Sequence, residues 1–269
     1  MQEGASVKRV GLVTRILEAN DRIAAANRER FDLARLSVID VMGSPGAGKT
    51  TLLESTISRL AGKLRAGVIV GDIATTRDAD RLAAHGIPAI QITTETFGGA
   101  CHLEASAIAA ALDQLDMESL DVLFVENVGN LVCPAEFDLG QHARVVVLSV
   151  AEGEDKPLKY PLAFQTADLV VLDKTDLLPY LTYDLAALRD NLRRVKPEGE
   201  HLELSARTGE GVDGWVSWIC DRVAKLRHRA AGDPRSSSAA TAPESRGPSA
   251  PATHSHGHTH GHSHDHSRG

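Results

Sequence analysis

The stretch that decides the fold is VIDVMGSPGAGKTTLLESTISRL, residues 38–60. A short apolar run, 38–42, leads directly into GSPGAGKT at 43–50, and a helical pattern of apolar residues follows. The octapeptide matches G-x-x-x-x-G-K-[ST] in the strand–loop–helix context that a phosphate-binding loop (P-loop) requires. Its glycines let backbone N–H groups turn toward a phosphate, and the N-terminus of the next helix adds positive potential. We therefore predict a nucleotide site here, in preference to a glycine-rich turn without a ligand.

Two side chains of this loop have specific predicted roles. Lys49 is expected to bridge the β- and γ-phosphates, and the Thr50 hydroxyl is expected to bind Mg²⁺. The residues predicted to hold the phosphates are Gly43, Ser44, Gly46, Ala47, Gly48, Lys49, Thr50 and Thr51.

Further apolar runs and helical stretches alternate along the chain. The runs rich in Val, Ile and Leu are 38–42, 68–70, 89–92, 122–125, 145–150, 169–172 and 202–204. The helical stretches between or after them include 51–60, 103–112, 184–195 and 214–227. Continuous apolar strands alternating with helices are typical of a parallel sheet covered on both faces. We predict an α/β fold with a mostly parallel seven-stranded sheet and helices on both faces, the P-loop NTPase fold.

The chain also divides by composition. Residues 1–36 form a predicted N-terminal helical segment, with a helix over 6–30, and residues 37–231 form the predicted P-loop domain. Residues 232–253 are rich in Pro, Ser, Ala and Gly without an apolar period, which predicts a disordered linker. Residues 254–269 form a histidine-rich tail, HSHGHTHGHSHDHSRG.

The overall composition of the 269 residues excludes several classes of protein. Hydrophobic residues make up 42% and charged residues 24%, as in ordinary globular proteins. A net charge of −7 and 4% aromatics argue against nucleic-acid binding. No apolar run is long enough to span a membrane, three cysteines cannot build a disulfide framework, and the N-terminus is too polar for a signal peptide. These features predict a cytoplasmic protein without a membrane or nucleic-acid partner.

The choice between ATP and GTP depends on the later strand ends. The run 169–172 ends in Asp173-Lys174-Thr175-Asp176, which is similar to the N-K-x-D element that selects guanine. Asp176 is placed to accept hydrogen bonds from the guanine N1–H and 2-amino groups, and the Lys174 stem can lie along the base. Asp173 departs from the element, because it lacks the amide that Asn would donate to the base or to the P-loop. The Ser205-Ala206 pair after the last strand resembles the S-A element, whose backbone contacts guanine O6, so we favour GTP.

Two other strand ends carry carboxylates. Asp72 follows the run 68–70, and Glu126 begins Glu126-Asn127-Val128-Gly129, which resembles the D-x-x-G switch element with Glu in place of Asp. Because parallel α/β sheets bind ligands at the carboxyl ends of their strands, both carboxylates are expected near Mg²⁺ and the attacking water. Gly129 is expected to sense the γ-phosphate through its N–H. The alternative for Asp72 is a helix N-cap.

Metal-binding residue types occur in two places. Cys101, His102 and Cys133 are a plausible ligand set for Ni²⁺ or Zn²⁺, and Cys133 lies just after the predicted γ-phosphate sensor. Three ligands leave a tetrahedral shell incomplete, so the site is expected to be open or shared with a second chain. In the tail, alternation with Ser, Gly, Thr and Asp favours a native nickel-binding segment over a purification tag. Its histidines are His254, His256, His258, His260, His262, His264 and His266.

Taken with these motifs, longer stretches resemble the HypB family, GTPases that help insert nickel into [NiFe] hydrogenase. The matching stretches cover most of residues 16–183 and are ILEANDRIAAANRERF, GSPGAGKT, GDIATTRDADR, GACHLEA, ENVGNLVCPAEFDLG, and LSVAEGEDKPLKYP through DKTDLLPY. The resemblance implies a nickel metallochaperone of the SIMIBI class of P-loop GTPases. It also implies a metal site of Cys101, His102 and Cys133 at a GTP-dependent homodimer interface, with a HypA-like nickel protein and the hydrogenase large subunit as partners.

The chain departs from that family in three respects, and other functions stay open. Its histidines lie at the C-terminus and not the N-terminus, the cysteine-rich N-terminal motif of some members is absent, and Asp173 replaces Asn. The alternatives are a related metallochaperone GTPase for urease or a cobalamin enzyme, a non-enzymatic nickel store, and a small-molecule kinase. The Cys-His and Cys loops argue against the urease branch, which uses a Cys-Pro-His motif. The intact P-loop argues against a simple store.

Overall fold

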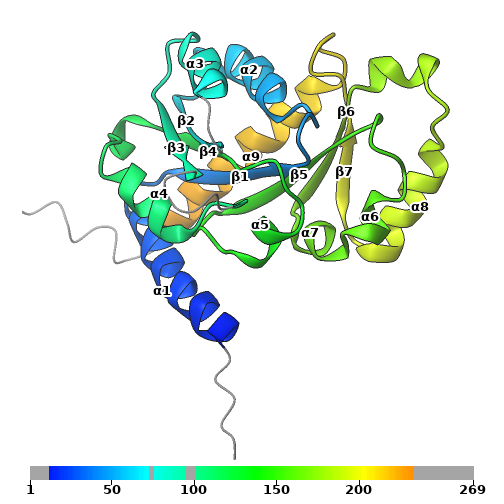
Figure 1. Ribbon diagram of the computed structural model, residues 1–269. Helices are drawn as coiled ribbons and strands as arrows, with labels where there is room; N and C mark the ends of the chain where they lie inside the picture. The colour runs from blue at the N-terminus through cyan, green and yellow to red at the C-terminus, as the bar shows by residue number, and fades with distance from the viewer. Residues whose placement is uncertain (1–11, 73–75, 95–100, 233–269) are drawn as a thin grey trace, which may run out of the picture.

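The computed structural model describes residues 12–72, 76–94 and 101–232, in which strands and helices alternate (Figure 1). The strands are β1 (Ser37–Gly43), β2 (Ala66–Asp72), β3 (Ala89–Thr93), β4 (Val122–Glu126), β5 (Ala143–Ser149), β6 (Leu169–Asp173) and β7 (Glu200–Glu203). The helices are α1 (Leu12–Leu33), α2 (Lys49–Leu60), α3 (Arg77–Ala83), α4 (Ala105–Leu112), α5 (Cys133–Glu136), α6 (Lys156–Lys159), α7 (Pro161–Thr166), α8 (Leu185–Val195) and α9 (Val212–Gly232). Short 3₁₀ segments cover Met117–Ser119 and Thr175–Tyr180.

All seven strands form one parallel sheet in the order β3-β2-β4-β1-β5-β6-β7. The predicted fold class is therefore confirmed, and the sheet is parallel throughout. β1 lies between β4 and β5, with Val41 opposite both Glu126 and Val145. The P-loop consequently leaves the sheet at its centre, where the carboxyl ends of β1, β2, β4 and β6 converge.

Helices cover both faces of the sheet (Figure 1), and alternate residues of β1 pack against the two helical layers. On one face, Ile39 and Val41 of β1 pack with α2, α3 and α9, including the fully buried Trp215. On the other face, Val38 lies in an apolar cluster with α1 and α4, and Met42 lies in a second cluster with α5, α7 and α8. Burial of both faces explains why the strands read as continuous apolar runs.

Several element boundaries differ from those predicted. α1 ends at Leu33, three residues beyond the predicted helix, and β7 begins two residues earlier than the run 202–204. Gly232, predicted to begin the linker, is the last residue of α9. The remainder of the predicted linker and the whole histidine tail lie outside the described residues. Within the described part of the chain, no helix is both long and apolar enough to cross a membrane.

Candidate functional site

The P-loop borders a cavity of about 480 Å³ at the carboxyl edge of the sheet. Gly46 and Gly48 have φ angles of 74° and 111°, which the loop can adopt because glycine lacks a Cβ. The Lys49 Nζ donates to the carbonyls of Gly43 and Ser44 at 3.2 and 3.3 Å, and Ala47 is buried beneath the loop. Burial lowers the pKa of Lys49, with nearby Glu126 opposing that effect. The cavity is lined on this side by Pro45, Gly46, Gly48, Lys49, Thr50 and Thr51.

The predicted Mg²⁺ residues Thr50, Asp72 and Glu126 all line this same cavity. The Thr50 hydroxyl donates to Glu126 Oε1 at 2.8 Å, and Asp72 also lines the cavity. Glu126 Oε2 is buried and accepts no hydrogen bond from the described residues. An unpaired buried carboxylate oxygen beside a hydroxyl is a suitable environment for a hard divalent cation, so these residues fit Mg²⁺. The N-cap of α3 is Thr76, so Asp72 does not cap that helix.

Gly129 lies directly against the P-loop. A Cβ built at this position would approach the Pro45 Cγ to 2.9 Å and the Pro45 nitrogen to 3.1 Å. Only glycine therefore fits without displacing the loop. This places the predicted γ-phosphate sensor in contact with the segment that would hold the phosphate.

The two predicted guanine elements lie side by side. The Asp173 Oδ1 accepts from the backbone N–H groups of Lys174 at 2.6 Å and Ala206 at 2.8 Å. The Lys174 Nζ donates to the Gly46 carbonyl of the P-loop at 2.6 Å. Asp173 thus joins the two guanine elements as an acceptor, and Lys174 makes the link to the P-loop that an Asn side chain was expected to make.

Asp176 is held by two neighbours. Its Oδ1 accepts from the Ser205 hydroxyl at 2.6 Å, and its Oδ2 accepts from the Arg207 Nε at 3.0 Å. The Ser205 and Arg207 donors lower the pKa of Asp176. The carboxylate that would accept from guanine is therefore anchored in its charged form.

The three predicted transition-metal ligands form one cluster. Cys101 and Cys133 lie 2.9 Å apart between sulfur atoms, and all three candidate ligand atoms of Cys101, His102 and Cys133 lie within 4.8 Å of one another. The donor set of two thiols and an imidazole suits Ni²⁺ or Zn²⁺ better than Mg²⁺. The hydrogen bond from Cys101 raises the pKa of the Cys133 thiol.

The surroundings of His102 favour its role as a metal ligand. Its ring packs against the Phe137 ring at a tilt of 34°, with centroids 4.0 Å apart, and both ring nitrogens are buried without a hydrogen-bond partner among the described residues. Burial lowers the pKa of His102, which favours the neutral imidazole that binds metals. Such unpaired nitrogens are costly unless a ligand satisfies them.

Several residues near the cavity were not predicted from the sequence. Asp78 and Arg81 line the cavity, and Arg81 donates to the Thr51 hydroxyl at 3.3 Å. The Lys156 Nζ reaches the Ser44 hydroxyl at 3.4 Å. The charged spacing in RDADR is the signal that could have identified Arg81, since residues three or four apart share one face of a helix.

This fold and site define a P-loop nucleotide-binding protein in which a cluster of two cysteines and a histidine, able to hold a metal ion, lies next to the loop that follows β4. Residues 37–203 match the family described as "CobW/HypB/UreG, nucleotide-binding domain". The Hydrogenase maturation factor HypB of Azotobacter chroococcum mcd 1 is 51% identical over 215 residues, covering 80% of this chain and 70% of that protein.

Two solved structures are also similar. HypB from Helicobacter pylori in complex with nickel has 39% identity and a TM-score of 0.73, over 77% of this chain and 96% of that one. The hydrogenase maturation factor HypB from Archaeoglobus fulgidus has 35% identity and a TM-score of 0.71, over 77% and 100%. The chain therefore belongs to the HypB hydrogenase maturation factors within the CobW/HypB/UreG family.

Proposed function

We propose that this protein is a GTPase that binds nickel and assists its insertion into [NiFe] hydrogenase, using GTP hydrolysis as a switch. One observation carries the proposal. The short segment 126–133 begins at the cavity with Glu126, contacts the P-loop at Gly129, and ends at the metal cluster with Cys133. A loop rearranged by phosphate release would move a nickel ligand.

The residues around the cavity have different proposed roles in GTP hydrolysis. Lys49 balances charge that develops on the transferred phosphoryl group, and its position within the P-loop pre-organises that contact. Thr50, Glu126 and Asp72 are the residues that would hold Mg²⁺. When bound, Mg²⁺ neutralises phosphate charge. Asp176, Lys174, Ser205 and Ala206 would select guanine.

The Cys/His cluster would hold the nickel cargo, or Zn²⁺ in its place. Because one chain supplies three ligands, we propose that a GTP-dependent homodimer shares or completes the site. A HypA-like nickel protein is the proposed partner in transfer, and the hydrogenase large subunit is the proposed recipient. The proposed compartment is the cytoplasm. The proposed domain arrangement adds a flexible linker and a histidine tail that stores further nickel.

The test compares hydrolysis of GTP and ATP by the full chain and by a chain that ends at Ala231, each with and without Ni²⁺. We expect GTP to be strongly preferred by both chains. We also expect the shortened chain to retain nickel that depends on Cys101 and Cys133. Equal turnover of ATP would contradict the guanine assignment, and loss of all nickel binding in the shortened chain would contradict the proposed cluster.

A further inference from the structure

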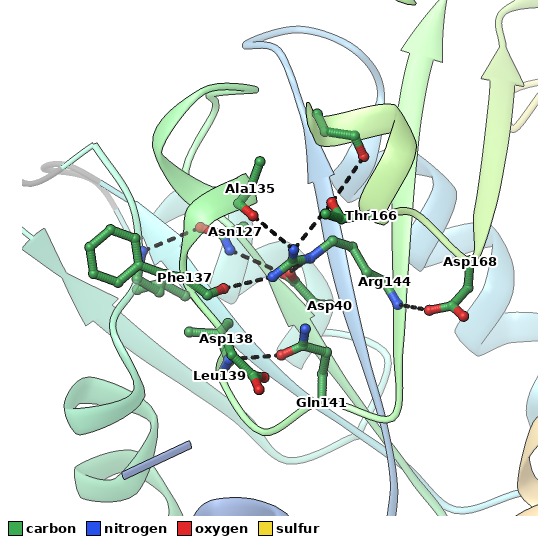
Figure 2. Close-up of polar contacts among 12 residues, drawn as sticks. Asp40, Asn127, Ala135, Phe137, Asp138, Leu139, Gln141, Arg144, Thr166 and Asp168 are labelled. Carbon is green, nitrogen blue, oxygen red and sulfur yellow. Dashed lines mark hydrogen bonds and ion pairs between the residues drawn. The ribbon is translucent and has the colours of Figure 1, made fainter. Parts of the chain in front are cut away.

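A buried polar cluster lies on the sheet face that α4, α5 and α7 cover. Asp40 of β1, Asn127 after β4 and Arg144 of β5 are each less than 7% exposed. They lie between the apolar cluster around α4 and the apolar cluster around α7. The Asp40 carboxylate accepts from Asn127 Nδ2 at 3.1 Å and from Arg144 Nε at 3.2 Å (Figure 2).

Arg144 also holds the chain that follows Cys133. Its Nη1 donates to the Ala135 carbonyl at 3.1 Å, and its Nη2 donates to the Phe137 carbonyl at 2.6 Å (Figure 2). The Phe137 ring is the one that packs against the His102 ring. One guanidinium therefore holds the backbone just after Cys133 and the backbone of Phe137, whose ring contacts His102.

Asn127 makes the matching contact to the other metal segment. Its Oδ1 accepts from the backbone N–H of Leu103 at 3.3 Å and from that of Val128 at 3.0 Å. Leu103 directly follows Cys101 and His102. Asn127 itself directly follows Glu126, whose carboxylate bonds to Thr50. The cluster thus contacts both metal-ligand segments and the switch loop.

A cluster of this kind resists partial disruption. Separating one partner from a buried charge pair leaves an uncompensated charge, which is far more costly than moving the group as a unit. A shift of residues 126–129 would therefore be passed to the ligand segments through Asn127, Asp40 and Arg144, because their hydrogen bonds are kept. The alternative is a scaffold that stabilises every nucleotide state equally.

We propose that Asp40, Asn127 and Arg144 are positioning residues that transmit the nucleotide state of the switch loop to the geometry of the Cys101, His102 and Cys133 site. The inference rests on the proposed nickel-binding GTPase function and adds the residues that couple its two sites. Arg144 is outside the lining of the nucleotide cavity, so its replacement tests transmission and leaves the nucleotide contacts in place.

The test measures nickel affinity of the full chain with bound GDP and with a non-hydrolysable GTP analogue. Thiolate-to-nickel charge-transfer absorption reports the cysteine site separately from the tail histidines, and a chelator sets free Ni²⁺. In the wild type we expect the two affinities to differ by about 5- to 150-fold. Arg144→Lys keeps the positive charge but cannot span Asp40 and both carbonyls, so the ratio should fall to within about twofold of one.

Arg28→Lys is the matched control. Arg28 donates to the Asp138 carboxylate at 3.0 and 2.9 Å, on the same loop that Arg144 holds, without contacting the buried cluster. This variant should keep the wild-type affinity ratio. A ratio lost equally in Arg28→Lys would overturn the specific role of the cluster.

A double variant, Asp40→Asn with Arg144→Met, covers the case in which Arg144→Lys does not fold. It removes both buried charges, a change that proteins often tolerate, and leaves an acceptor for Asn127. It should bind the GTP analogue but lose the affinity ratio. If the double variant, and Arg144→Lys where it folds, keep the wild-type ratio of nickel affinities, the inference is overturned and the proposed function is not affected. Equal affinities in the wild type would instead contradict coupling in the proposed function itself and remove the basis of the inference.

Discussion

Glu126 offers a quantitative test of the nucleotide site. Its side chain lies at the end of β4 and is 4% exposed, with Oε1 bonded to Thr50 and Oε2 unpaired among the described residues. Burial raises the pKa of Glu126 to about 7, against opposing effects from Thr50 and Lys49. The carboxyl group should therefore be largely protonated below neutral pH when no Mg²⁺ is bound.

The size of the effect on the free energy of unfolding follows from the pKa shift of Glu126. A rise from 4.5 to about 7 corresponds to about 3 kcal/mol, at about 1.4 kcal/mol for each pKa unit. Because the folded state binds this proton more tightly than the unfolded state, the contribution to stability is fully present below about pH 4.5 and is lost as the pH rises through about 7. Mg²⁺ requires the carboxylate, so binding of Mg²⁺ with GTP should release a proton below pH 7 and tighten as the pH rises.

The assay is urea unfolding of the nucleotide-free protein between pH 5 and pH 8, with Glu126→Gln as the control. Gln preserves the shape and is neutral throughout, so the wild type should lose about 2–3 kcal/mol relative to the variant across this range. Calorimetry in buffers of different ionisation enthalpy should detect the released proton. Stability profiles that stay parallel within about 0.5 kcal/mol would refute the reasoning.

Three further predictions concern the nucleotide and the tail. Lys49→Ala should reduce GTP hydrolysis by at least about 10²-fold without unfolding the protein, as phosphate release and circular dichroism will report; turnover within about twofold of wild type would reject the P-loop assignment. Asp176→Asn should lower the affinity for GTP and allow binding of xanthosine triphosphate, both measured by competition. Unchanged GTP affinity would place the base elsewhere. Deleting residues 254–269 should remove several bound nickel ions and leave GTP hydrolysis intact, since the proposed flexible linker would keep the tail independent; lost hydrolysis would assign the tail a structural role.

The sheet could be predicted because parallel strands that are buried on both faces appear in the sequence as continuous apolar runs. β1, β4, β5 and β6 are buried along their whole length, and the P-loop motif fixes β1 and α2. The short helices α5, α6 and α7 have four to six residues and no clear apolar period, so the sequence did not indicate them. Their positions depend on packing against the sheet.

Within the described part of the chain, the predicted site residues lie along one edge of the sheet, but their supporting contacts depend on the register of the sheet. Asp40 and Arg144 are 104 residues apart and meet because β1 pairs with β5 in a register that places them opposite each other. In the sequence, Asp40 interrupts an apolar run without indicating a partner. The role of Asp173 was likewise hidden, because its hydrogen bond to Ala206 joins loops that are distant along the chain.

The central claim is that Cys133 couples nickel binding to the nucleotide. Calorimetric titration of Ni²⁺ into the chain ending at Ala231, in its GDP form and with a non-hydrolysable GTP analogue, tests it most directly. The account predicts that the nickel affinities of the two nucleotide states differ by about 5- to 150-fold. By linkage, bound nickel should change the relative affinity for the two nucleotides by the same factor. Cys133→Ala should abolish the difference and retain nucleotide binding. Equal nickel affinities in the two wild-type states would contradict the account and leave Cys133 as a static ligand at most.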